Sequence, residues 1–348
     1  MALRGLPKEK VVQRLSITLF GLFALVTFWL FINVTSDSSS RTAASSQTPK
    51  AWQEKATLPE PRKFEAAVSI DGKIYCVTSG DDTGQDGGRI YAYDPAADTW
   101  TRKSGVRVAR HSSGFGSQGG RIYAISGALE KRLAPDEPVL TPAFEEYDPA
   151  ADSWTVRAPI PRPRLFAVGA GVAGKIYAIG GVVPGGPQLS HTRWVDEYDP
   201  KTDRWTQKAD MPIETRAYRV AVANGKIYVV GGADRTFSKL LAEVNEYDPS
   251  TDTWTARSPM PTARADYALT AFSGRLYAFG GLGGMSATEE YDPGANVWRT
   301  RSSPPVSSWL QVAASTSDRI YLIGGWEGGW PGGSVVDSVL EYWPDRDK

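Results

Sequence analysis

One short pattern recurs along most of this chain of 348 residues and constrains its fold more than any other feature. A complete copy begins with GKIYVVGG at 225–232, passes through a variable loop and ends with YDPSTDTW at 247–254. Five copies of Tyr-Asp-Pro are each followed seven positions later by tryptophan, the tyrosines being Tyr93, Tyr147, Tyr198, Tyr247 and Tyr291. This fixed spacing predicts a fold assembled from repeated structural units.

Each copy also contains a strand-like run that ends in glycine, such as KIYAIGG at 175–181 and RLYAFGG at 275–281. The run, the glycine doublet, the Tyr-Asp-Pro and the tryptophan together resemble the kelch-repeat family over about residues 51–348. Two copies depart from the doublet, with Ser79-Gly80 and Ser126-Gly127. The spacing of about 44 to 54 residues between tryptophans is typical of four-stranded kelch blades. The resemblance implies an all-β propeller.

The two ends of the repeat region predict how many blades there are. The last copy supplies three strands, at about 309–315, 319–323 and 335–342, and Lys348 lies one residue short of the expected tryptophan. Trp52 precedes Arg62 by the same ten residues that separate Trp100 from Arg110. We therefore expect a six-bladed propeller closed by an N-terminal outer strand, because closure removes an exposed sheet edge.

The first 50 residues differ in composition from the repeats. Residues 15–34 carry no charge, and this stretch is as long as a helix that crosses a bilayer. Residues 1–14 form a basic tail. These features predict a cytoplasmic tail, a transmembrane signal anchor over 15–34 and a propeller outside the cytoplasm, in the periplasm or the extracellular space. A cleaved signal peptide with a small-residue site at 34–36 is the alternative. The Ser/Thr-rich residues 35–50 predict a flexible linker.

Composition narrows the classes of partner. Lys+Arg and Asp+Glu are both 39, so no nucleic-acid partner is expected. Cys76 is the one cysteine, which excludes an internal disulfide and predicts a buried thiol. GAGVAG at 169–174 matches a dinucleotide-binding pattern, but it leads into a strand and predicts a hairpin. The acidic loop at 81–86 lacks the glutamate that a calcium loop carries. The chain has two histidines, which are too few to predict a metal site, so neither a cofactor nor a metal is expected.

Strand alternation predicts which face carries a site. The connections between the second and third strands of each blade, and those between blades, should lie on one face, named here the b–c face. The opposite face carries short turns. Arginines recur at the start of the innermost strand on the b–c face, namely Arg62, Arg110, Arg164 and Arg264, with Arg216 one residue later in its copy. Two interpretations stay open: these arginines bind a carboxylate or phosphate, or they brace adjacent blades, as the kelch resemblance implies.

Other side chains are expected near the same face. The ligand-binding candidates besides the arginines are His111, Tyr218, Tyr267, Trp309 and Trp326. Trp330 lies in the same loop as Trp326. Aromatic rings beside hydrogen-bonding groups suit a sugar, whereas the alternative is that the tryptophans pack the loop 326–333 against its neighbours.

These features lead to two hypotheses of different classes. The first is a membrane-tethered kelch propeller that binds a protein or a glycan through its b–c face and is not an enzyme; no adaptor domain is expected in the first 50 residues. The second rests on a resemblance in size, blade number and compartment to exported six-bladed sialic acid mutarotases. That resemblance implies an acid–base group, for which Glu65, Asp266 and Glu327 are candidates. A resemblance to copper radical oxidases is weaker, because Cys76 and Tyr75 point to opposite faces of their strand.

Overall fold

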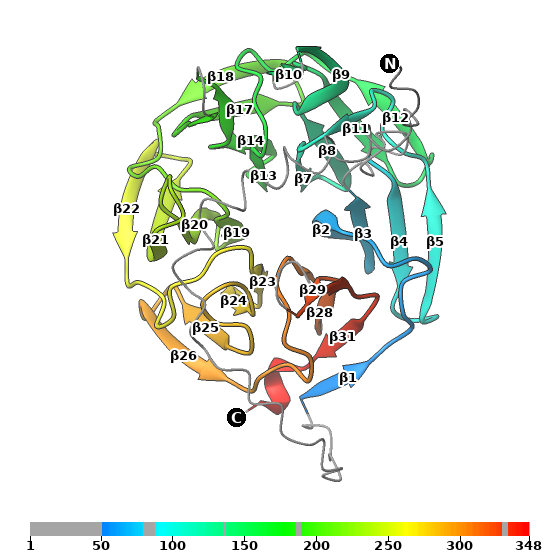
Figure 1. The fold of residues 1–348 in the computed structure, drawn as a ribbon, viewed down its shortest axis with the longest axis vertical. Coiled ribbons are helices and arrows are strands. Elements are labelled where there is room, and N and C mark those ends of the chain that lie inside the picture. The colour runs from blue at the N-terminus through cyan, green and yellow to red at the C-terminus, as the bar shows by residue number, and fades with distance from the viewer. Residues whose placement is uncertain (1–50, 79–87, 135–136, 186–188, 329–332, 348) are drawn as a thin grey trace, which may run out of the picture.

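The described part of the chain is built almost wholly from β-strands. A computed structural model of the protein describes residues 51–78, 88–134, 137–185, 189–328 and 333–347. Six four-stranded antiparallel sheets are arranged as blades around a central axis (Figure 1). In five blades the strand that comes first in the chain lies innermost, and in the last blade β27 lies innermost. The predicted all-β class and the six predicted blades are confirmed.

The blades follow one another in chain order, and their strands are given from the axis outward. The first two consist of β2 (Phe64–Ile70), β3 (Lys73–Thr78), β4 (Ile90–Asp94) and β5 (Thr99–Lys103), then β7 (Gly114–Gln118), β8 (Arg121–Ile125), β11 (Phe144–Asp148) and β12 (Ser153–Val156). The next two consist of β13 (Val168–Val172), β14 (Lys175–Ile179), β17 (Val195–Asp199) and β18 (Arg204–Lys208), then β19 (Arg219–Ala223), β20 (Lys226–Ala233), β21 (Leu240–Asp248) and β22 (Thr253–Arg257). The last two consist of β23 (Ala268–Phe272), β24 (Arg275–Phe279), β25 (Thr288–Asp292) and β26 (Val297–Arg301), then β27 (Val312–Ser315), β28 (Ile320–Ile323), β31 (Val339–Tyr342) and β1 (Trp52–Glu54).

The repeated tyrosine and tryptophan form a latch that ties each blade to the segment before it. Tyr198 donates a hydrogen bond to Asp203 at 2.6 Å, and the same carboxylate oxygen accepts the backbone N–H of Ala158 at 2.9 Å. Trp205 donates its indole N–H to the carbonyl of Ala158, also at 2.9 Å. Both backbone groups of one residue are thus satisfied by the next blade, and equivalent bonds recur in the other blades. This latch explains the fixed spacing of the signature.

The sixth latch joins the two ends of the repeat region. Strand β1 pairs with β31, with Trp52 opposite Tyr342, and the two rings lie 4.5 Å apart. Trp52 donates to the carbonyl of Ser302 at 3.3 Å, while Asp347 accepts bonds from Tyr342 and from the N–H of Ser302. Trp52 therefore occupies the place of the tryptophan that the last copy lacks, and the predicted N-terminal outer strand is confirmed.

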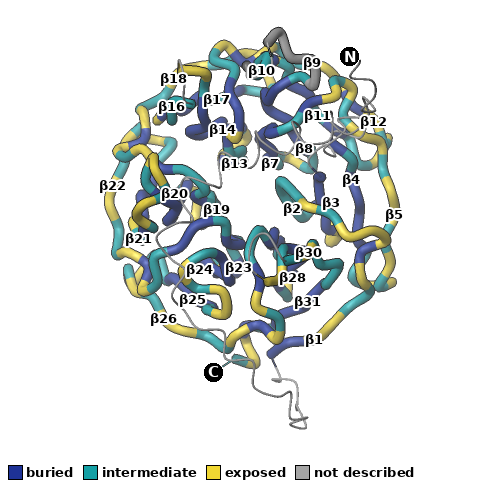
Figure 2. The backbone as a smooth tube through the Cα atoms, in the orientation of Figure 1, coloured by how far each residue is buried: buried dark blue, intermediate teal, exposed yellow. Residues whose placement is uncertain are grey.

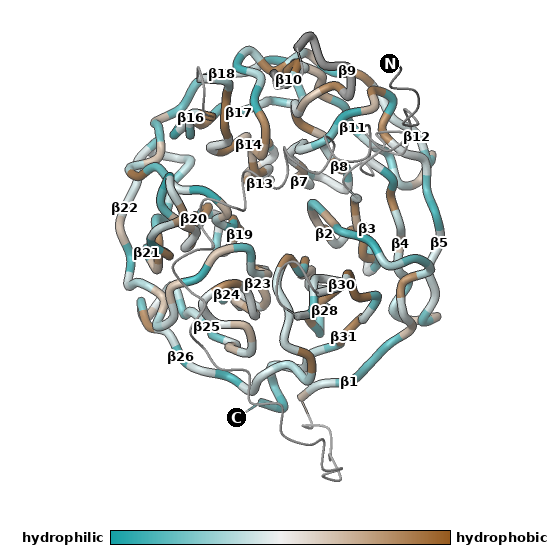
Figure 3. Tube along the Cα trace, in the orientation of Figure 1, coloured by the Kyte–Doolittle hydropathy of each residue, from teal (hydrophilic) through white to brown (hydrophobic). Residues whose placement is uncertain are grey.

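The core lies in the two middle strands of each blade. Strands such as β14 and β28 are buried along almost their whole length, whereas outer strands such as β5 and β22 are largely exposed (Figure 2). The middle strands are correspondingly apolar (Figure 3), because both of their faces pack against neighbouring blades. Cys76 is buried in the same layer, as predicted.

Small hairpins extend the b–c connections on one face of the propeller. They comprise β9 (Ala128–Ala134) and β10 (Glu137–Leu140) with β6 (Arg110–His111), β15 (Val182–Pro184) with β16 (Leu189–His191), and β29 (Trp326–Glu327) with β30 (Ser334–Val335). Ser126-Gly127 starts the first of these connections, and a glycine doublet starts each of the other two. Gly181 has a φ of 106°, and a Cβ there would lie 2.6 Å from the carbonyl oxygen of Leu165, so the tight approach requires glycine. GAGVAG at 169–174 lies in the hairpin of β13 and β14, as predicted.

The predicted N-terminal elements lie outside the described residues. This applies to the expected span at 15–34 and to the linker at 35–50. Within the ranges that the structure describes, no helix has the length and apolar character needed to cross a membrane.

Candidate functional site

A cavity of about 520 Å³ opens on the b–c face at the mouth of the central channel. Its volume lies in the range of small-ligand sites. Its walls come from the residues just before the innermost strands and from the b–c hairpins. The lining includes the side chains of Phe64, Glu65, His111, Ser112, Leu165, Phe166, Leu189, His191, Arg216, Ala217, Tyr218, Arg219, Phe237, Asp266 and Leu310. The prediction that this face carries the irregular surface therefore matches the position of the cavity.

A ring of strained residues forms the rim of this cavity. One residue from each blade occupies an equivalent position there, and we name the set the rim residues: Phe64, Ser112, Phe166, Ala217, Asp266 and Leu310. All but Phe64 have a positive φ, between 50° and 57°. The N–H of Phe166 donates to the carbonyl of Ser112, and the N–H of Leu310 donates to that of Asp266, so the strained positions bond across the blade boundaries.

This backbone conformation costs about 1–2 kcal/mol per non-glycine residue and is rare for bulky side chains. Phe166 and Leu310 adopt it nevertheless, and Phe166 is 47% exposed. A large apolar side chain held in a strained conformation at a cavity mouth is the kind of outlier that clusters at functional sites. The rim is thus the strongest structural mark of a site on this molecule.

The upper wall of the cavity is mostly apolar. Phe166, Leu165 and Leu189 come from the third blade and its hairpin, and Phe237 comes from the fourth. Arg216 lies with its guanidinium carbon 4.3 Å from the ring centroid of Phe237, in a cation–π contact. This part of the wall offers a ligand apolar surface beside one guanidinium.

The floor of the cavity carries opposite charges. Glu65, at the start of β2, and Arg219, at the start of β19, line both this cavity and a second one of about 340 Å³ that continues along the channel. Arg219 and Asp266 have their nearest charged atoms 3.9 Å apart, and both side chains keep about a quarter of their surface exposed. We name as the floor this loose cluster of two carboxyls around one guanidinium, in which Glu65 and Arg219 are joined by the carboxyl of the rim residue Asp266.

Burial shifts the titration of these acids. Loss of hydration raises the pKa of Glu65 to about 7, and the positive charge of Arg219 opposes the shift. Burial likewise raises the pKa of Asp266, against the effects of Arg219 and Arg216. Both carboxyls therefore gain protons more readily than an exposed acid, which suits a group that exchanges protons near neutral pH.

Both histidines of the chain line the cavity. His111 lies 3.0 Å, through Nδ1, from the hydroxyl of Ser112. Burial lowers the pKa of His191, and the charge of Arg216 lowers it further, so this imidazole is neutral at physiological pH. Tyr218 is buried in the wall and donates its hydroxyl to the carbonyl of Ile179 at 2.8 Å.

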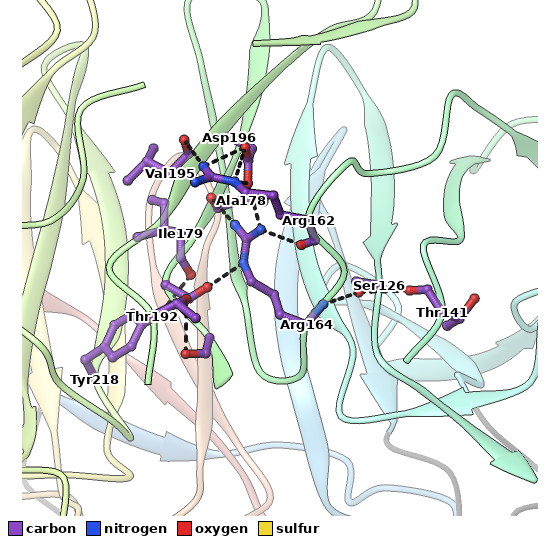
Figure 4. Close-up of polar contacts among 12 residues, drawn as sticks. Ser126, Thr141, Arg162, Arg164, Ala178, Ile179, Thr192, Val195, Asp196 and Tyr218 are labelled. Atoms are coloured by element: carbon purple, nitrogen blue, oxygen red, sulfur yellow. Dashed lines mark hydrogen bonds and ion pairs between the residues drawn. The ribbon is translucent and has the colours of Figure 1, made fainter. Parts of the chain in front are cut away.

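Three of the predicted arginines brace their blades instead of lining the cavity. Figure 4 shows Arg164 donating to Asp196 at 2.7 Å and to the carbonyls of Ala178, Gly180 and Arg162. Its side chain is fully buried. Arg110 pairs in the same way with Glu145, and Arg264 with Glu289. Of the two interpretations that the sequence left open, the geometry of these three arginines corresponds to bracing.

The remaining predicted residues lie away from the cavity lining. Arg62 pairs with Glu60 near the surface, and Tyr267 is buried with its hydroxyl bonded to the carbonyl of Val230. Trp309 and Trp326 pair with each other through their backbones, with ring centroids 6.2 Å apart. Glu327 is exposed. Trp330 and the acidic loop at 81–86 lie outside the described residues.

Sequence reasoning missed Arg219, Phe237 and the rim residues Phe64, Ser112, Phe166, Ala217 and Leu310. One signal was available: the rim residues all stand two positions after the recurring arginine or its replacement, and their identities differ widely. The bracing arginines also had a signal. In the three copies whose arginine braces a blade, an acid stands two positions before the signature tyrosine: Glu145, Asp196 and Glu289. The other three copies have Tyr91, Asn245 and Leu340 at that position.

Known proteins share this architecture. A family model for the Kelch motif matches residues 163–212 and 215–261. Beta-scruin of Limulus polyphemus is 28% identical over 56% of this chain and 21% of its own length, and Kelch-like protein 25 of Xenopus tropicalis is 30% identical over 51% and 30%. The chain thus spans less than a third of the length of these relatives. The solved structure of YjhT superposes with a TM-score of 0.67 at 17% identity, covering 83% of this chain and 97% of that one, which shows a common fold.

The fold and its cavity define a six-bladed β-propeller with a ligand-sized site on one face. The chain contains Kelch motifs at residues 163–212 and 215–261, and the repeat signature and the relatives support the kelch-repeat family.

Proposed function

We propose that this protein is a binding module that recognises a protein or glycan partner through its b–c face, with the cavity at the centre of the interface. The observation that carries the proposal is the rim, where Phe166 is held in a strained conformation and exposed to solvent. Its kelch-repeat relatives support a protein partner. We also propose that residues 15–34 tether the propeller to a membrane, with the b–c face outside the cytoplasm.

Site-specific photocrosslinking in the producing cells tests this proposal. A photoreactive phenylalanine analogue replaces Phe166 in one variant and Val297 in a second. Val297 is a matched control, because it is also an exposed apolar residue, 41% exposed, but it lies on the outer strand β26. We expect a discrete adduct from position 166 and none from position 297. The same adduct from both positions, or none from 166, would contradict the proposal.

A second candidate function is acid–base catalysis on an acidic sugar, such as exchange of its anomers. The specific observation in its favour is Glu65, whose pKa is raised to about 7 beside Arg219. Glu65 would transfer the proton of the anomeric hydroxyl to the ring oxygen as the ring C–O bond breaks, and it would return a proton when that bond re-forms on the other face of the carbonyl. Arg219 would hold the sugar carboxylate. Exchange spectroscopy by NMR on N-acetylneuraminate tests it. A rate above the uncatalysed one that Glu65→Gln abolishes and Glu327→Gln preserves would support it, and an uncatalysed rate with the unmodified protein would exclude it.

A further inference from the structure

We propose that the cavity binds a carboxylate joined directly to an apolar group. The carboxylate would lie against Arg219 on the floor, and the apolar group would pack beneath Phe166 and Phe237. Two sources have this chemistry, a free small organic acid and the carboxyl terminus of a peptide from a partner. The inference rests on the proposed function, because it names the chemical group that the same cavity recognises.

Most N–H donors of the Arg219 guanidinium make no hydrogen bond to the described residues. Among the described residues it makes one hydrogen bond, from Nη1 to the carbonyl of Tyr218 at 3.1 Å, and its nearest carboxylate atom, in Asp266, is 3.9 Å away. The bracing arginines differ sharply, since Arg164 makes four hydrogen bonds to backbone and carboxylate oxygens. A guanidinium whose donors are so little used, at the floor of a cavity, suits a carboxylate that accepts two parallel bonds.

The walls of the cavity indicate the chemical character of the rest of the ligand. The rim and upper wall present phenylalanine and leucine side chains beside the polar groups of Ser112, Asp266 and Arg216, and Phe166 offers nearly half of its surface to whatever enters. Burying the apolar surface favours a ligand with an apolar body over one that carries hydroxyl groups alone. The floor limits the charge to one, because Glu65 and Asp266 would repel a second carboxylate.

Binding of a carboxylate should also move a proton. The charged and titratable groups that line the cavity with Glu65 are Arg219, Asp266, Arg216, Tyr218, His111 and His191. Strands β7 and β27, which pack on either side of β2, contribute no titratable side chain. An anion placed on the floor raises the pKa of Glu65 further, so at pH 7.5 the complex takes up a proton that the free protein lacks. Affinity should therefore fall as the pH rises from 6 to 8.

Isothermal titration calorimetry with the purified full chain tests these inferences. One arm compares 3-phenylpropionate with its neutral analogue 3-phenylpropan-1-ol and with gluconate. The other arm compares a pentapeptide ending in phenylalanine with the same peptide amidated at its C-terminus. We expect at least one carboxylate with an apolar neighbour to bind ten or more times more tightly than its neutral analogue, and gluconate not to bind. The arm that gives the tighter complex identifies the source.

Two variants connect the binding to the floor. Arg219→Gln should weaken the carboxylate at least tenfold, whereas Arg204→Gln, the same change on the exposed face of β18, should not change its affinity. Titrations in phosphate and in Tris at pH 7.5 should show proton uptake by the unmodified protein and none by Glu65→Gln. This second readout remains informative if Arg219→Gln proves unstable.

The outcomes separate this inference from the proposed function. Equal binding of the acid and the alcohol, binding of gluconate alone, or no binding in either arm would overturn the inference. Proton uptake that persists in Glu65→Gln would overturn the role of that carboxyl. The crosslink from position 166 to a partner can survive each of these results, in which case the proposed function stands without this ligand chemistry.

Discussion

Arginines at nearly the same place in the repeat have two different surroundings in this propeller. Arg164 is sealed inside its blade and pairs with Asp196, whereas Arg216 lies beside Phe237 in the cavity wall. The two differ by one residue in the repeat, because Thr215 takes the bracing position in the fourth blade and bonds the carbonyl of Gly231 at 3.1 Å. Neighbouring residues in an extended segment point to opposite sides. A one-residue displacement therefore moves a guanidinium from the blade interior to the ligand cavity.

Removing a bracing arginine should have a large effect on stability. Arg164→Met removes one of the two arginines that pair with the buried Asp196, the other being Arg162, and leaves three backbone carbonyls without its donors, so we expect the free energy of unfolding to fall by about 3 kcal/mol. For a chain of this size the melting temperature should fall by at least about 6 °C. Circular dichroism measures this change, and Arg204→Met on an exposed site should change the stability by less than about 0.5 kcal/mol. A variant as stable as the unmodified protein would show that Arg164 does not brace the blade.

A second test of the bracing role introduces the buried arginine–acid pair into the fourth blade. Thr215→Arg alone places a charge in a buried site where the partner position holds Asn245, so we expect a loss of about 3 kcal/mol or more. Adding Asn245→Glu recreates the pair of the other blades and should recover at least half of the lost melting temperature. Equal melting temperatures for the single and double variants would mean that the bracing geometry does not transfer between blades.

The pH dependence of stability distinguishes the cavity floor from the bracing pairs. The pKa of Glu65 is about 7 in the folded protein and about 4.3 when unfolded, so the folded state holds more protons between these values. Its contribution to stability is greatest below about pH 4.3 and is lost as the pH rises through 7, by up to about 4 kcal/mol. Glu65→Gln should therefore melt at a higher temperature than the unmodified protein at pH 8. The exposed Glu327→Gln is the control, and an equal shift in both variants would contradict the assignment.

The smallest expected effect on stability belongs to the cavity arginine. Arg219 pairs loosely with Asp266 at 3.9 Å and is partly exposed, so Arg219→Gln should change the free energy of unfolding by less than about 1 kcal/mol. Thermal melts of this variant beside Arg164→Met make the contrast directly. A loss as large as that of Arg164→Met would place Arg219 among the structural arginines and remove the basis for a ligand role.

Sequence reasoning reached the blades because their signature is local. The tyrosine, the aspartate five residues later and the tryptophan seven residues later meet within one turn and one strand, as Tyr198, Asp203 and Trp205 do. The closing strand was also predictable, since Trp52 keeps the spacing to Arg62 that the other copies keep. The site was harder to predict. Of the residues named in advance, His111, Arg216, Tyr218, Glu65 and Asp266 line the cavity, and the others lie in blades, in loops or outside the described residues.

The sequence by itself determined the all-β class, the repeat and the number of blades, and it predicted the face that carries the irregular connections. These follow from spacing along the chain, and spacing is carried by the sequence. The tertiary structure decided which arginines are buried and which face the cavity. It also brought Glu65, Arg219 and Asp266 together from the first, fourth and fifth blades. The physical reason is that a side chain's charge state and partners depend on residues from other blades, whose approach is set by how the blades pack around the axis.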